Sequence, residues 1–128
     1  MAVQLNHTII KARDAAGSAA FLSQLLGTAP PEHLPPFHEV KLGNGVAMDY
    51  MDVDHDVDGQ HYAFIVTEPE FDEIFGRIQA QGIEYFADPH AKRPGEINRH
   101  DGGRGVYWSD PEGHWLEMIT VPYGGWPA

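Results

Sequence analysis

The feature that most constrains the fold is an internal repeat, because the second half of the chain restarts the pattern of the first. Each half opens with a strand pattern that contains a histidine, His7 in the first half and His61 in the second. A helix pattern follows in each half. Each half then returns in strands to a carboxylate four residues after a turn glycine, at Asp49 and at Glu117. A repeat of this length predicts two copies of one supersecondary unit.

Composition narrows the classes of protein that fit this chain. Its 128 residues, 42% of them hydrophobic, suit a single compact domain with modules at about 1–54 and 60–122. The absence of cysteine excludes disulfides and cysteine-based zinc sites. A net charge of −11 argues against nucleic acid and anionic membranes as partners. No apolar run has transmembrane length and no signal-peptide pattern opens the chain, so a cytoplasmic location is expected.

Hydrophobic periodicity and turn residues predict the same element order in both halves. Asp14 is placed to cap the first helix and Gly27 to end it. The proline-rich stretch 28–36 is a loop or a poor edge strand, and the charged stretch 88–103 is a long loop. Helices are expected over 15–26 and 70–81, and strands over 5–12, 37–42, 46–51, 61–67, 83–86, 104–109 and 115–121.

Glu117 is an unusual residue in its strand, because its neighbours are large and apolar. An ionised carboxylate on a buried face is costly unless it is paired or binds a metal. The alternative is an edge strand in which Glu117 faces water, since alternate residues of a strand point to opposite faces.

The repeat suggests partners for Glu117. If the two modules pair about a pseudo-twofold axis, the equivalent residues His7, Asp49, His61 and Glu117 converge. Two imidazoles and one or two carboxylates can bind a divalent metal, and three protein ligands leave positions open for substrate and water. The alternatives are hydrogen-bonded core or surface histidines, and an Asp49 that belongs to a solvated acidic run with Asp52.

Three blocks of sequence resemble the vicinal-oxygen-chelate superfamily. They are 5–8, 60–64 and 102–117, and the most specific is Asp-Pro-Glu-Gly at 110–113 followed by an apolar strand with Glu117. This superfamily includes glyoxalase I, extradiol ring-cleavage dioxygenases, fosfomycin-resistance enzymes and bleomycin-resistance proteins. The resemblance extends over almost the whole chain.

The resemblance implies an α+β fold of two paired βαβββ modules, which form a cupped mixed sheet with the helices outside. It carries the family's metal ligands to His7, His61 and Glu117. A fourth ligand of glyoxalase-like members falls on Asp49, which is shorter than the usual Glu or Gln, so the chain is nearer to the three-ligand dioxygenases. The resemblance also implies a homodimer.

The function expected from the resemblance is that of a divalent-metal enzyme. Its small substrate is chelated through vicinal oxygens, and ring-cleavage dioxygenase chemistry is favoured. One alternative is a glyoxalase I-like lyase or isomerase, and another is a non-catalytic binding protein of the bleomycin-resistance type. The metal is Fe(II), Mn(II), Ni(II) or Zn(II), and no organic cofactor is evident. No nucleic acid or membrane partner is expected.

Further candidates lie in the long loop and in the strand after it. Polar and aromatic side chains there suit contacts to an oxygen-rich ring, or they belong to a solvated loop and a packed core. His114 follows a turn glycine and is expected on the surface. The candidates are Tyr107 and His100 as catalytic residues, and Asn98, Arg104 and Trp108 as substrate-binding residues.

Overall fold

The computed structural model describes residues 2–128 and divides the chain into two compact units. The first is Met1–Asp58 and the second is Gly59–Ala128, and each is described by itself. Within the described residues, each unit combines one α-helix with a mixed four-stranded sheet. This confirms the α+β class and the two βαβββ modules. Within the same residues, no helix combines the length and the apolar character that crossing a membrane requires.

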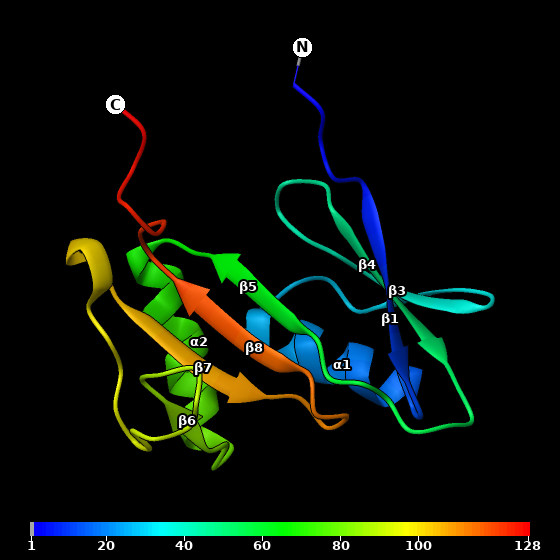
Figure 1. Cartoon of the computed structure of the whole chain (residues 1–128). Coiled ribbons are helices and arrows are strands. Elements are labelled where there is room, and N and C mark those ends of the chain that lie inside the picture. Colours follow the sequence, from blue (N-terminus) through cyan, green and yellow to red (C-terminus); the bar gives the residue numbers. More distant parts are fainter. Residues whose placement is uncertain (1) are drawn as a thin grey trace. The chain divides into compact units, whose positions relative to one another are not determined.

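The N-terminal unit is a four-stranded sheet with one helix (Figure 1). Its strand order is β1-β4-β3-β2; β1 runs parallel to β4 and the other neighbours are antiparallel. The proline-rich stretch thus contributes a short edge strand, β2. The elements are β1 (His7–Ala12), α1 (Ala15–Leu26), β2 (Glu32–Leu34), β3 (Phe37–Lys41) and β4 (Ala47–Asp52).

The C-terminal unit repeats this topology. Its strand order is β5-β8-β7-β6, with β5 parallel to β8 and antiparallel pairing elsewhere. The predicted strands at 83–86 and 115–121 are shorter than expected. The elements are β5 (His61–Ile65), α2 (Glu68–Ala80), β6 (Tyr85–Phe86), a 3₁₀ turn at His100–Gly102, β7 (Gly105–Ser109) and β8 (Trp115–Ile119).

Local sequence signals set the helix ends. The Asp14 carboxylate accepts a hydrogen bond from the Gly17 N–H at 3.0 Å, and Gly27 ends α1 in the left-handed conformation with φ +78°. Helix α2 begins with a capping box, in which Thr67 and Glu70 each accept a hydrogen bond from the other's backbone N–H. These hydrogen bonds with Thr67 lower the pKa of Glu70.

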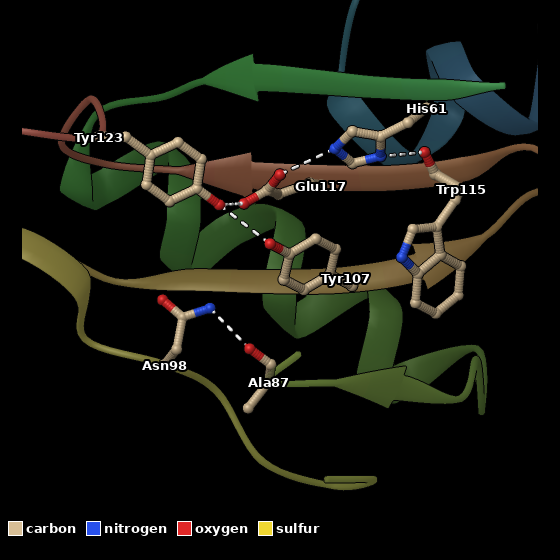
Figure 2. Close-up of polar contacts among 7 residues, drawn as sticks. All are labelled: His61, Ala87, Asn98, Tyr107, Trp115, Glu117 and Tyr123. Atoms are coloured by element: carbon tan, nitrogen blue, oxygen red, sulfur yellow. Dashed lines mark hydrogen bonds and ion pairs between the residues drawn. The ribbon is translucent and has the colours of Figure 1, made fainter. Parts of the chain in front are cut away.

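The two faces of the C-terminal sheet have different roles. One face carries the buried Val106, Trp108, Leu116 and Met118, and α2 lies behind it in Figure 2. The apolar stripe of α2 supplies the rest of this core. Burial of apolar surface contributes about 25 cal/mol per Å², so this core accounts for much of the unit's stability. The opposite face is therefore left to hold polar side chains.

The strand register makes the repeat visible at single residues. In β1, His7 pairs with a residue of β4 that lies two positions before Asp49. In β5, His61 pairs with Trp115, which lies two positions before Glu117. Since the register is the same, each unit presents its histidine and its carboxylate on one face of its own sheet.

Candidate functional site

His61 and Glu117 meet in the C-terminal unit on the face opposite α2 (Figure 2). The two residues come from the adjacent parallel strands β5 and β8. The His61 Nε2 atom lies 3.0 Å from Glu117 Oε1. Glu117 is only 1% exposed, so the alternative in which its carboxylate faces water is wrong. A buried carboxylate needs such a partner.

The other nitrogen of His61 fixes the orientation of the ring. His61 Nδ1 lies 2.8 Å from the Trp115 carbonyl oxygen. Because a carbonyl oxygen only accepts, Nδ1 donates to it, and Nε2 is the nitrogen that faces Glu117. A proton or a cation between Nε2 and the carboxylate oxygen stabilises this arrangement. A histidine whose second nitrogen is held by a carbonyl is the usual metal-binding arrangement, so these residues fit a divalent metal.

Two tyrosines support the second oxygen of Glu117. The Tyr123 hydroxyl donates to Glu117 Oε2. Tyr107 and Tyr123 hydroxyls lie 2.9 Å apart, and because Tyr123 donates to the carboxylate, Tyr107 donates to Tyr123. Burial and the hydrogen bond with Tyr123 raise the pKa of Tyr107 well above its ordinary value. Partial burial and the bond to Glu117 also raise the pKa of Tyr123, so both hydroxyls keep their protons at neutral pH.

Aromatic rings surround the carboxylate on this face. The Tyr107 ring stacks at 6.0 Å on His61 and at 6.0 Å on Trp115, and Phe86 lies 5.5 Å beyond Trp115. The indole Nε1 of Trp115 is buried and has no hydrogen-bond partner within residues 2–128. An unpaired buried donor is costly, so this group is suited to an oxygen atom of a bound molecule.

His7 and Asp49 belong to the N-terminal unit. His7 is exposed and its Nδ1 lies 2.8 Å from Asn6 Oδ1. Asp49 is 9% exposed, and its Oδ1 is buried without a hydrogen-bond partner in the described part of the chain. Across residues 2–128, no three His, Cys, Asp or Glu side chains form a metal-binding group. His7 and Asp49 therefore remain predicted ligands.

Tyr107 and His100 are the predicted catalytic residues. Tyr107 lies within the site through its bond to Tyr123. His100 lies on the 3₁₀ turn with its ring 6.1 Å from the Tyr123 ring. The structure thus places Tyr107 in the tyrosine pair beside Glu117, and His100 next to that pair.

Two of the three predicted substrate-binding residues have polar partners within the unit, and the third is buried in its core. Asn98 is buried, and its amide donates to the Ala87 carbonyl at 2.9 Å. Arg104 binds Glu68 at 2.7 Å and Asp72 at 2.9 Å in α2. Trp108 is fully buried on the face that carries α2, away from His61 and Glu117. Their role in substrate binding stays a prediction.

Two residues of the site were not predicted from the sequence, and one prediction was wrong. Tyr123 lies in a Gly/Pro tail without periodicity, and no motif in the sequence marks Trp115 as a site residue. The only signal was that Trp115 shares a strand face with Glu117. His114 is 1% exposed, not on the surface, because its ring turns inward to accept a backbone hydrogen bond.

Comparison with solved structures places this fold among known proteins. The chain is 56% identical to oxidase ChaP-H1, covering 97% of this chain and 100% of that one, with a TM-score of 0.94. It is 53% identical to oxidase ChaP-H2, covering 98% of each chain, with a TM-score of 0.95. No protein-family model matches the chain, and neither does any curated protein.

A more distant structure shares the fold alone. It is a glutamine variant of the fosfomycin resistance protein FosX from Listeria monocytogenes, complexed with Mn(II) and 1S,2S-dihydroxypropylphosphonic acid. The identity is 21%, the coverage 94% of this chain and 91% of that chain, and the TM-score 0.69. The repeated βαβββ units, with a histidine beside a buried carboxylate, define a vicinal-oxygen-chelate protein. The chain belongs to that superfamily, in the same family as the oxidases ChaP-H1 and ChaP-H2.

Proposed function

We propose that this protein is a divalent-metal-dependent oxidase of the dioxygenase type, which acts on a small aromatic substrate carrying two vicinal oxygens. The observation that carries the proposal is the His61–Glu117 pair, in which Nε2 lies 3.0 Å from an oxygen of a buried carboxylate. The oxidase names of the two relatives above 50% identity favour oxidation over the glyoxalase alternative.

The chain's own residues have distinct tasks in this proposal. His61 and Glu117 hold the metal, with His7 as the predicted third ligand and Asp49 as a possible fourth. When bound, the metal supplies Lewis-acid activation of the two substrate oxygens and, as Fe(II), the redox chemistry of oxygen. Tyr123 holds the second carboxylate oxygen of Glu117.

The substrate side of the proposal rests on the aromatic face. The stacked rings of Tyr107 and Trp115 suit a planar ring. The unpaired Trp115 Nε1–H supplies a hydrogen bond to an oxygen substituent. Tyr107, whose raised pKa keeps it protonated, donates to Tyr123 and keeps the tyrosine pair neutral beside the carboxylate.

The test is metal content followed by oxygen uptake. The purified protein is loaded with Fe(II), Mn(II), Ni(II) or Zn(II) and assayed with a panel of catechols and, separately, with a glutathione hemithioacetal. We expect stoichiometric metal and Fe(II)-dependent oxygen consumption with a catechol. Activity with the hemithioacetal under Ni(II) or Zn(II) would favour the lyase.

A matched variant separates catalysis from simple binding. His61→Ala is expected to lose metal and oxygen uptake. Ligand binding that does not change in His61→Ala, together with no stoichiometric metal in the wild type, would instead support a bleomycin-resistance-type binding protein.

A further inference from the structure

His114 is a buried imidazole that the proposed function does not use. It is 1% exposed and lies immediately before β8. Its Nδ1 accepts a hydrogen bond from the Gln60 backbone N–H at 3.0 Å. The acceptor nitrogen of the ring is therefore bound to the main chain of a residue 54 positions earlier in the sequence.

The residue that His114 holds is the neighbour of a metal ligand. Gln60 precedes His61 and lies just outside β5. The Gln60 carbonyl accepts from the Trp115 N–H at 2.8 Å, so both backbone groups of Gln60 are bound to the pair His114–Trp115. The Trp115 carbonyl in turn accepts from His61 Nδ1 at 2.8 Å.

The backbone and the ring of His114 are both held by neighbouring residues. The His114 N–H donates to Asp110 Oδ1 at 2.8 Å, and its carbonyl accepts from the Asp110 N–H at 2.9 Å. The Tyr62 ring meets it edge-on at 5.8 Å. At Gly59 the two chain segments approach so closely that an added Cβ would lie 2.6 Å from the Gly113 carbonyl oxygen. His114 and Gln60 are therefore held close together by contacts on both chain segments.

We propose that His114 is a positioning residue for the metal centre. Its Nδ1 fixes the Gln60 peptide, which sets the start of β5 against β8 and aligns His61 with the Trp115 carbonyl that orients its ring. The inference rests on the proposed function, because it takes His61 to be a metal ligand. The required feature is the acceptor at the Nδ1 position, not the size of the ring.

Two substitutions separate the acceptor from the volume. His114→Asn keeps an oxygen at the position of Nδ1, whereas His114→Leu keeps bulk without an acceptor. We expect Mn(II) to bind His114→Leu about 10- to 100-fold more weakly than the wild type, the range seen when outer-shell partners of metal ligands are lost. His114→Asn is expected to stay within about 3-fold of the wild type. If His114→Leu does not fold, His114→Gln also lacks an acceptor at that position.

A second measurement is made on the metal-free protein. NMR is expected to show slow exchange of the Gln60 amide and of the His61 Nδ1 proton in the wild type and in His114→Asn. Both protons are expected to exchange faster in His114→Leu. Ile78→Ala, in the core contributed by α2, is the control for lost stability and is expected to leave Mn(II) affinity and both protons unchanged.

The outcomes separate the positioning role of His114 from the proposed metal-dependent function on which it rests. Wild-type Mn(II) binding with equal binding by His114→Leu overturns the inference alone. Loss of affinity in Ile78→Ala as large as that in His114→Leu also overturns it, since the effect would then be one of general stability. A wild type that binds none of the four metals overturns the proposed function, and the positioning role with it.

Discussion

Glu117 has two oxygens with different partners, and this division defines the chemistry of the site. Oε1 faces His61, while Oε2 accepts from Tyr123. Because Oε2 is occupied by Tyr123, the carboxylate presents Oε1 alone toward the imidazole Nε2. The tyrosine hydroxyl thus acts on a predicted metal ligand without being a predicted ligand itself.

Tyr123→Phe removes only the hydroxyl that holds Glu117. We expect Mn(II) affinity to fall about 10-fold, at the lower end of the effects of outer-shell partners. Calorimetric titration measures the change. Tyr85→Phe is the matched control, because the Tyr85 hydroxyl contacts Gln79, on the other face of the unit's sheet, at 3.5 Å. Equal affinities for wild type and Tyr123→Phe would show that Glu117 needs no such support.

The raised pKa of Tyr107 predicts a loss of stability in alkali. In the unfolded chain this hydroxyl ionises near its ordinary value of 10.0, whereas in the folded unit burial keeps it protonated. The contribution of Tyr107 to the free energy of unfolding is therefore complete below about pH 10. It falls as the pH rises further, by at most about 1.4 kcal/mol per pH unit. Urea unfolding of wild type and Tyr107→Phe between about pH 8 and pH 11 measures it. A variant whose stability falls as steeply as that of the wild type would contradict the assignment.

At the scale of elements, Arg104 joins the start of β7 to α2. It binds Glu68 and Asp72, and its guanidinium lies 4.3 Å above the Phe71 ring. Hydrogen bonds with Thr120 and Arg104 lower the pKa of Glu68, and the two carboxylates raise the pKa of Arg104 against the effect of its burial. These contacts lie on the helix side of the unit, so they suggest a structural role.

Arg104→Met tests that role against the predicted contact with substrate. Loss of the ion pairs and of the cation–π contact is expected to lower the free energy of unfolding by about 1–2 kcal/mol. KM for any catechol that the protein oxidises should stay unchanged. Chemical denaturation and steady-state kinetics measure the two effects. An increased KM with unchanged stability would favour substrate binding instead.

The elements also show where sequence reasoning succeeds and where it fails. Asp14 and Gly27 act within a few residues, so local rules find them. His61 and Glu117 were found because the repeat relates them to His7 and Asp49. Tyr123 was missed because its function depends on a hydroxyl returning to β8 from a stretch without periodicity. His114 was predicted on the surface because the turn rule does not include a backbone donor from Gln60, the residue before β5.

At the scale of the whole molecule, the remaining predictions concern His7 and assembly. The family resemblance predicts a homodimer, so sedimentation should give about twice the chain mass of 14.2 kDa. A mass equal to that of one chain would contradict it.

His7→Ala is expected to lose metal to the same degree as His61→Ala, which metal analysis of both variants measures. A His7→Ala variant with full metal content would remove His7 from the ligand set.

The shared register of the two units has an evolutionary consequence. A duplication of one βαβββ unit accounts for a chain in which His7 and Asp49 occupy the same positions as His61 and Glu117. After such a duplication, either copy of the carboxylate can change in length by a single substitution while the strands around it stay the same. Lineages with this architecture can therefore gain or lose a ligand, and so change their chemistry, without first inventing a new scaffold.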